Sequence, residues 1–212
     1  MNEEKIPFFS VIVPEHNSAA FMRKGLDSIR EQSFPNYELI IVCDRCEDDT
    51  EMIARKYTDR VIEIDAGRCG MARNAGLDAA TGEWILFMDD DDYWLHEYAF
   101  EMLANNVGKH EEDILAFSFI FRGKGYARNM PGYLWPAIWN KAWKREFIER
   151  VGARFPDWKH SDDAGFAQQT HGKAKIAYWD MPFNYYNYLR PVSLTWKIEN
   201  GILHKDPAED EK

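Results

Sequence analysis

Four consecutive aspartates, Asp89 to Asp92, directly follow an apolar run at residues 84–88. An uninterrupted apolar run of this length is typical of a strand buried on both faces of a sheet. Such a strand delivers the carboxylates together at its C-terminal end, where like charges repel unless a cation neutralises them. An isolated acidic run is usually a solvated turn, but the preceding strand favours a cluster built into the fold. A divalent cation carrying a phosphorylated ligand would neutralise it.

Apolar runs alternate with helical patterns through the first half of the chain. We expect buried strands at residues 8–13, 37–43, 61–64 and 84–88. Between them, helices are expected over residues 19–32, 49–56 and 71–79. This alternation predicts an α/β fold with a mostly parallel central sheet flanked by helices on both faces.

Acidic residues end two of these strands. The second expected strand ends at Asp44 and the fourth at Asp89. In open parallel sheets, ligands bind beyond the carboxyl ends of the strands, so both carboxylates should face one crevice. Hard oxygen ligands suit Mg²⁺ or Mn²⁺, and Mg²⁺ is typically held by one or two carboxylates together with substrate phosphates. The sequence therefore predicts a site for a metal and a phosphorylated ligand.

The pattern changes after Tyr93. Helices are expected over residues 97–106, 144–151 and 164–171, and strands over 114–121 and 175–179. No repeat or low-complexity linker divides the chain, so we predict one domain over residues 1–204. The change of pattern divides it into a first half, about 6–95, and a second half, about 96–200. The charged tail 205–212 is expected to be disordered.

Composition limits the classes of partner. The net charge of −10 argues against a broad electrostatic contact with nucleic acid. No apolar run approaches the roughly 18 residues of a membrane-spanning segment, and no signal peptide is evident, so we expect a soluble, cytoplasmic protein. Three cysteines make no disulfide framework. Cys43 and Cys46 have thioredoxin-like spacing but lack the usual aromatic and proline neighbours, which weighs against a redox role.

Several segments in order resemble one known family. They are FSVIVPEHN at residues 9–17, SIREQSFPNYELIIV at 28–42, ARNAG at 72–76 and TGEWI at 81–85. The chain is similar to glycosyltransferase family 2 from about residue 8 to residue 195. The resemblance implies the GT-A fold, which is Rossmann-like, and a transferase that uses a nucleotide-diphosphate sugar. It also implies that the half at about 6–95 binds the nucleotide and the half at about 96–200 binds the acceptor.

The resemblance also implies roles for residues on the donor side. Pro14 and His16 lie where the family holds the base and ribose, and Asp44 takes the place of its base-binding aspartate. The family usually has an aspartate pair there, whereas this chain has Cys43-Asp44. Arg73 is assigned to nucleotide-sugar binding, with a role in holding the acidic loop as the alternative.

The Asp-x-Asp motif of the family falls on the acidic run. The resemblance makes Asp89 and Asp91 the metal ligands, for Mn²⁺ or Mg²⁺. Contact with the ribose is the alternative role for Asp89, and Asp90 would lie against the sugar. A bound cation would stabilise the charge that develops on the diphosphate leaving group.

A second acidic site, at residues 160–166, resembles the Glu-Asp motif whose aspartate is the catalytic base in this family. Asp163 takes that position, and Asp162 replaces the glutamate. The alternative for Asp163 is an N-cap of the helix expected from residue 164. Arg190 resembles a closing arginine that pairs with the diphosphate, with a structural arginine as the alternative.

The expected function is an inverting, metal-dependent transfer of a sugar from a UDP-sugar to an acceptor hydroxyl. One alternative is a nucleotide-sugar-binding protein without transfer, suggested by the altered acidic motifs. The other is a metal-dependent nucleotidyltransferase, which ranks lower because no Gly-rich, Lys-bearing triphosphate loop is evident. A glycan, a lipid-linked glycan or a protein could each be the acceptor.

Overall fold

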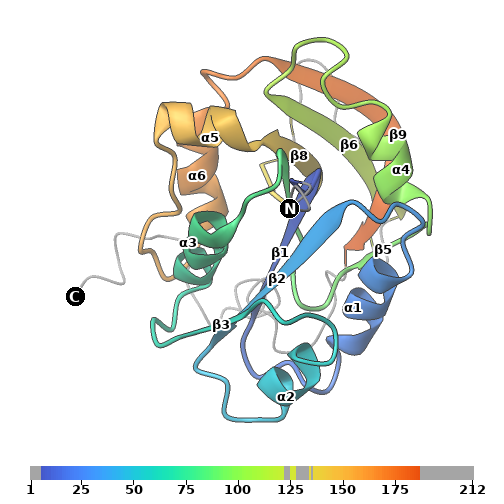
Figure 1. The fold of residues 1–212 in the computed structure, drawn as a ribbon. Coiled ribbons are helices and arrows are strands. Elements are labelled where there is room, and N and C mark those ends of the chain that lie inside the picture. The colour runs from blue at the N-terminus through green and yellow to red at the C-terminus, as the bar shows by residue number, and fades with distance from the viewer. Residues whose placement is uncertain (1–5, 122–124, 128–133, 135, 187–212) are drawn as a thin grey trace, which may run out of the picture.

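The computed structural model describes residues 6–121, 125–127, 134 and 136–186. Its strands are β1 Phe9–Glu15, β2 Tyr37–Asp44, β3 Val61–Ile64, β4 Trp84–Phe87, β5 Tyr93–Trp94, β6 Ile114–Phe121, β7 Gly125–Ala127, β8 Lys141–Lys144 and β9 Ile176–Tyr186. They form one sheet in the order β3-β2-β1-β4-β8-β6-β9-β5, with β7 paired to β6 (Figure 1). The α/β class is confirmed.

The first four strands are parallel. Both β2 and β4 flank β1, and β3 adds to β2. Their bounds agree with the sequence prediction to within two residues at each end. Because the strands are parallel, the carboxyl ends of β1, β2 and β4 meet at one edge of the sheet. Asp44 ends β2, and Asp89 follows β4 by two residues, so the predicted common edge is confirmed.

The rest of the sheet is mixed, which differs from the expected mostly parallel arrangement. The short strand β8 lies antiparallel between β4 and β6, and Ala142 pairs with both Leu86 and Leu115. Parallel pairing returns between β6 and β9, while β5 is antiparallel to β9. The sequence patterns do not predict β8, because four residues are too few for a periodic signal.

Helices cover both faces of the sheet, as expected (Figure 1). They are α1 Arg23–Arg30, α2 Thr50–Ala54, α3 Cys69–Ala79, α4 Ala99–Ala104, α5 Arg145–Val151 and α6 Asp162–Thr170. One core cluster joins α1, α2 and α4 to the sheet, and a second joins α3, α5 and α6. The helix at residues 23–30 is shorter than the expected 19–32, because residues 19–22 form turns.

Alternate residues of the central strands pack on opposite faces. In β2, Ile41 and Cys43 belong to the cluster beneath α1, whereas Val42 belongs to the cluster beneath α3. By the same alternation, Asp44 faces the α3 side. Helix α3 lies close to the sheet, since a Cβ on Gly76 would collide with Ile12 of β1. This close approach brings the α3 side chains within reach of the strand ends.

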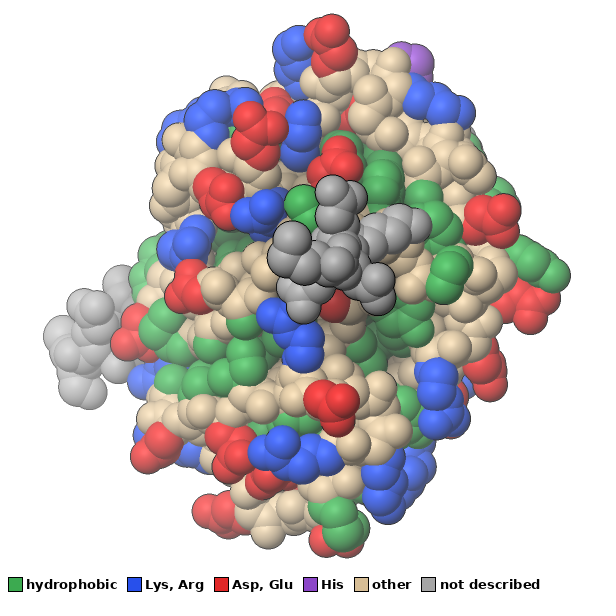
Figure 2. All heavy atoms as spheres, viewed as in Figure 1, with side chains coloured by type: hydrophobic (Ala, Val, Ile, Leu, Met, Phe, Trp, Pro, Cys, Tyr) green, Lys and Arg blue, Asp and Glu red, His purple; other side chains and the backbone are tan. Residues whose placement is uncertain are grey.

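The helices and the surface charge also bear on the expectation of a protein that neither spans a membrane nor binds nucleic acid. None of the helices within the described ranges has the length and apolar character needed to cross a membrane. On the face shown in Figure 2, acidic and basic side chains of described residues are interspersed, with no continuous basic stripe there. The charged tail 205–212 and Arg190 lie outside the described residues, and the division into donor and acceptor halves stays a prediction.

Candidate active site

One arginine gathers carboxylates from two distant parts of the chain. Arg73 on α3 donates from Nη2 to Asp89 Oδ1 at 2.6 Å. Its Nη1 donates to Asp162 Oδ2 at 2.6 Å and to Asp163 Oδ1 at 2.9 Å. We call Arg73, Asp89, Asp162 and Asp163 the acidic cluster. It joins the end of β4 to the first turn of α6.

Local packing places these groups together. The Arg73 side chain is only 5% exposed, because α3 lies against both the sheet and α6. A Cβ on Gly70 would lie 3.1 Å from Asp162 Cβ and 3.0 Å from Phe155 Cβ, so the absent side chain lets α6 approach. We call the contact between α3 and the segment 155–163 the seam. Asn74 of α3 bonds across it: its Nδ2 donates to Phe155 O at 2.8 Å, and its Oδ1 accepts from Phe155 N at 2.9 Å.

The acidic cluster carries excess negative charge. One guanidinium faces three carboxylates, which leaves a net charge of −2 when all are ionised. Burial raises the pKa of Asp163 to about 7; Asp162 and Asp89 add to the rise, while Arg73 and Lys141 oppose it. A carboxyl group with this pKa changes its protonation state near neutral pH, which suits a general base.

The two carboxylates of α6 differ in access. The Asp162 side chain is 9% exposed, whereas that of Asp163 is 28% exposed. Helix α6 begins at Asp162 rather than at the expected residue 164, and Ser161 takes the N-cap position with a left-handed φ of 61°. Asp163 therefore lies in the first helical turn and contacts Arg73 across the seam, so the alternative of an N-cap role is wrong.

Lys141 is a residue of this region that the sequence patterns did not identify. It starts β8 with its side chain fully buried, and its Nζ donates to Asn140 Oδ1 at 2.8 Å and to Ala137 O. Burial lowers the pKa of Lys141 to about 7, against the attraction of Asp163. A lysine followed by apolar residues carries no signal of burial, because its location depends on the unexpected strand.

Asp44 organises the loop that precedes α3. Its Oδ1 accepts from the amides of Ala66 at 2.8 Å and Gly67 at 2.9 Å, and its Oδ2 accepts from the amide of Arg68 at 2.8 Å. Asp44 is 4% exposed. The carboxylate thus shapes the edge of the sheet beside the acidic cluster. A contact with a nucleotide base stays a prediction.

Pro14 and His16 lie at the same edge. Pro14 is a buried residue of β1 beside Val42 of β2. The exposed His16 ring donates from Nδ1 to the backbone oxygen of Asp44 at 2.6 Å, which fixes its position. Both residues are therefore at the end of β1, next to Asp44, where the sequence placed them.

The acidic run after β4 turns back into the fold. Asp89, Asp90 and Asp91 are partly exposed, whereas Asp92 is 1% exposed. Within the described part of the chain, no three His, Cys, Asp or Glu side chains are grouped closely enough to hold a metal by themselves. A cation at Asp89 and Asp91 would need oxygen ligands from a bound molecule, as is usual for Mg²⁺.

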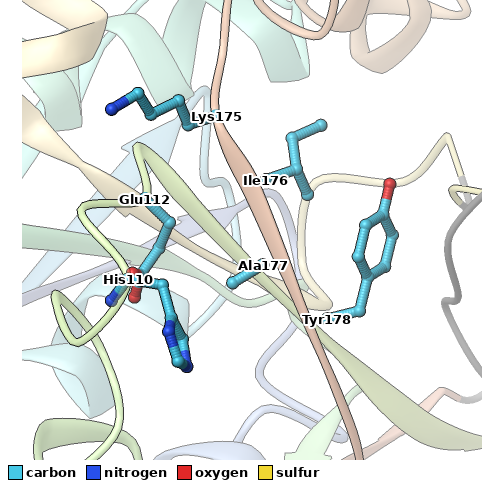
Figure 3. A pocket seen from close by; sticks show the side chains of 6 residues that line it. All are labelled: His110, Glu112, Lys175, Ile176, Ala177 and Tyr178. Carbon is cyan, nitrogen blue, oxygen red and sulfur yellow. The ribbon is translucent and has the colours of Figure 1, made fainter.

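A hollow of about 390 Å³ lies elsewhere, between the loop before β6 and the start of β9. Figure 3 shows Lys175 and Ala177 on the side of the strand that carries His110 and Glu112, while Ile176 and Tyr178 point the other way. Both Glu112 carboxylate oxygens accept nearby backbone amides, at 2.5 and 2.9 Å. None of the residues that line this hollow belongs to the acidic cluster.

Known proteins are similar to this chain in sequence and in fold. The model described as "Glycosyl transferase family 2" matches residues 10–170. The putative glycosyltransferase EpsH of Bacillus subtilis (strain 168) is 27% identical over 208 residues, covering 85% of this chain and 60% of EpsH. The poly(ribitol-phosphate) beta-N-acetylglucosaminyltransferase TarS of Staphylococcus aureus (strain Mu50 / ATCC 700699) is 33% identical over 131 residues, covering 58% of this chain and 23% of TarS. The chain is thus shorter than these relatives.

Solved structures agree with these matches. S. aureus TarS 1–349 in complex with UDP-GlcNAc has a TM-score of 0.75 and 26% identity, covering 84% of this chain and 58% of that one. The mannosyltransferase PcManGT from Pyrobaculum calidifontis, in complex with GDP-Man and Mn²⁺, shares the fold with a TM-score of 0.68. It is 21% identical and covers 93% of this chain and 61% of its own. The family model spans most of the chain, and the chain therefore belongs to glycosyl transferase family 2.

Proposed function

We propose that this chain transfers a sugar from a UDP-sugar to an acceptor hydroxyl with inversion at the anomeric carbon. The observation that carries the proposal is the acidic cluster. In it, Arg73 donates both to Asp89, which follows β4, and to Asp163 of α6. The groups expected to serve the donor and the acceptor thus meet at one guanidinium. An inverting transfer needs both on opposite sides of one sugar.

The donor would occupy the edge formed by β1, β2 and β4. Pro14, His16 and Asp44 lie together there and would hold the base and ribose, while Arg73, Asp89 and Asp90 would contact the diphosphate and sugar. The ligand of the TarS complex, UDP-GlcNAc, supports a uridine donor. Arg190, outside the described residues, stays a predicted diphosphate contact.

The residues fit a divalent cation. Asp89 and Asp91 present hard oxygen atoms on a partly exposed turn, and the acidic cluster beside them has excess negative charge. Asp89 Oδ1 is occupied by Arg73, which leaves Oδ2 as the oxygen to offer a metal. Bound Mn²⁺ or Mg²⁺ would supply positive charge for the departing diphosphate.

Asp163 would take the proton from the acceptor hydroxyl as its oxygen attacks the sugar. Two observations favour it over Asp162. Its side chain has about three times the exposed fraction, 28% against 9%. Its pKa, raised to about 7 by burial, gives the carboxylate a higher proton affinity than an ordinary aspartate. Asp162 would instead keep Arg73 in place.

The Asp163→Asn variant tests the base. We expect transfer from a UDP-sugar with Mn²⁺ to fall by about 10²- to 10⁴-fold, while UDP still raises the melting temperature by mass action. Asp78→Asn is the matched control, because Asp78 lies on α3 with its side chain 64% exposed and paired to Arg154. Undiminished transfer by a folded Asp163→Asn protein would refute the assignment.

The same measurements separate the alternatives. UDP binding by the unmodified chain with no transfer to any acceptor in a broad panel would indicate a binding protein. Release of pyrophosphate from a nucleoside triphosphate would indicate a nucleotidyltransferase. Hydrolysis of the donor in the absence of acceptor, lost in Asp163→Asn, would support a transferase whose acceptor lies outside the panel.

A further inference from the structure

Three polar side chains, one each from β6, β7 and β9, bond to one another. Ser118 Oγ donates to Asp180 Oδ1 at 2.8 Å; the Tyr126 hydroxyl donates to the same carboxylate oxygen and lies 3.3 Å from Ser118 Oγ. We call Ser118, Tyr126 and Asp180 the Tyr126 patch. Ser118 is fully buried, Asp180 is exposed, and Tyr126 is 50% exposed. The patch therefore holds one aromatic ring in place at the surface.

The Tyr126 patch lies on the face of the sheet that carries α6. Trp143 of β8 contacts Phe166 of α6, with ring centroids 5.2 Å apart. Ile114 of β6 pairs with Trp143 and belongs to the same core cluster. Because alternate residues of a strand share a face, Ser118, four residues after Ile114, points to the α6 side. Asp163, the proposed base, is carried by α6, so the base and the patch share one face.

The patch is also level with the acidic run that follows β4. Strands β4 and β6 run in the same direction, because β8 is antiparallel to both, and Ala142 pairs with Leu86 and with Leu115. Three residues beyond these partners come Asp89 after β4 and Ser118 in β6. Two strand spacings, together about 10 Å, separate β4 from β6. The patch thus lies across β8 from the strand end that precedes Asp89 (Figure 1).

Strand β6 continues past β8 at this edge. Strand β8 begins at Lys141, opposite Ala116, whereas β6 runs on to Phe121 and pairs there with β7. Tyr126 of β7 pairs with Ile120, beyond the end of β8. Because half of the Tyr126 side chain is exposed, this extension of the sheet presents an accessible aromatic ring beside the proposed active site.

A saccharide matches this combination of groups. The faces of a pyranose ring carry C–H groups that pack against a flat aromatic ring, and its hydroxyls need hydrogen-bond donors and acceptors. Tyr126 supplies the ring, and the exposed Asp180 carboxylate supplies acceptor oxygens beside it. Tyrosine gives such a contact at a small entropic cost, because few side-chain torsions have to be fixed. The bond to Asp180 already fixes this ring.

We propose that the Tyr126 patch binds the acceptor, and that the acceptor is a saccharide longer than a single sugar unit. This inference rests on the proposed function and names its acceptor class. The reacting unit would place a hydroxyl at Asp163, and a further unit would pack on Tyr126, about 10 Å across the sheet from the strand end at Asp89. The patch would therefore select acceptors by a unit that does not react.

The test measures saccharide binding by the full chain in the presence of UDP and Mn²⁺. An array of immobilised oligosaccharides is the probe, and calorimetry then gives the affinity for the saccharide bound best. Tyr126→Phe and Tyr126→Leu form a matched pair, because both lose the bond to Asp180 and only the first keeps a flat ring. We expect several-fold weaker binding by Tyr126→Leu than by Tyr126→Phe. Tyr98→Leu is the control and should bind like the unmodified chain, since Tyr98 is 53% exposed at the start of α4.

Two results would overturn the proposal: an array on which no saccharide is bound, or equal affinities of Tyr126→Phe and Tyr126→Leu. Donor binding is read separately, as the rise in melting temperature with UDP and Mn²⁺, and should be the same in every variant. If UDP binds and no saccharide does, the saccharide site fails and the proposed function stands. If a saccharide binds through Tyr126 while the unmodified chain neither binds UDP nor transfers a sugar, the proposed function fails and the saccharide site stands.

Discussion

The strands at residues 9–87 and those at residues 114–186 bring residues to the acidic cluster in different ways. In the first part, neighbouring strands are parallel and are joined through helices, so that Asp44 and Asp89 reach one edge by topology alone. In the second part, β8 is antiparallel to β4, and α6 is positioned by packing against α3. Asp163 and Lys141 therefore reach the site through tertiary contacts.

This difference indicates which contacts of the site are most sensitive to substitution. The first part carries the proposed donor contacts on strand ends within a continuous core, whereas the second part depends on the seam between α3 and the segment 155–163. Arg73 and Asn74, neighbours on α3, make the polar contacts across that seam. Substitutions of the α3 residues at the seam should therefore weaken the packing between the two parts more than substitutions elsewhere in either part.

Arg73→Met should have the largest effect on stability. Removing the guanidinium leaves Asp89, Asp162 and Asp163 facing one another in a partly buried cluster. Breaking a buried ion pair from one side typically costs about 3–5 kcal/mol. Urea unfolding followed by circular dichroism should show that loss, and limited proteolysis should cleave the segment around α6 first.

Two further variants show whether the loss comes from the seam. Arg55→Met removes an arginine that pairs with two carboxylates, Glu51 and Glu63, on the surface; it should change stability little. Adding Asp162→Asn to Arg73→Met should recover part of the loss, because one of the unpaired charges is removed. Equal losses for Arg55→Met and Arg73→Met would show that the seam has no special weight.

Sequence reasoning located the carboxylates at the strand ends and, through the family resemblance, Asp163, but it did not locate β8 or the buried Lys141. Strands such as β2 are continuous apolar runs, and their C-terminal residues follow directly from the pattern, so Asp44 and Asp89 could be located. Strand β8 is only four residues long and lies between strands distant in sequence. No local periodicity reports such a pairing, and burial of Lys141 depends on it.

The contacts of Arg73 show a second limit. Its position on a helix near the acidic run could be predicted, and holding the acidic loop was one of its expected roles. Arg73 also contacts Asp162 and Asp163, which lie 89 and 90 residues later in the sequence. These contacts depend on the close approach of α6 at Gly70. Sequence spacing alone does not specify such a contact.

Asn74→Ala should have the next largest effect. The Asn74 side chain pairs both backbone groups of Phe155, and all these atoms are buried. Truncation leaves a buried N–H and a buried C=O without their partner, which costs about 1–2 kcal/mol each at the lower end of the usual range. We expect a total loss of about 2–4 kcal/mol in urea unfolding. Asn106→Ala is the control, since the Asn106 side chain donates from Nδ2 to Met102 O in the turn that follows α4, away from the seam; a loss as large there would contradict the emphasis on the seam.

Lys141→Met should have the smallest effect on stability and should be read from the pH dependence of transfer. Asp163 must be ionised to accept a proton, so activity should fall as the pH drops through its pKa of about 7. The Lys141 ammonium lowers that pKa, and its removal should raise it. The acid limb of kcat/KM should then move to higher pH, with a larger loss of activity at pH 6 than at pH 8. A lysine that only fills space would lower activity equally at both pH values, because methionine has similar bulk and no charge.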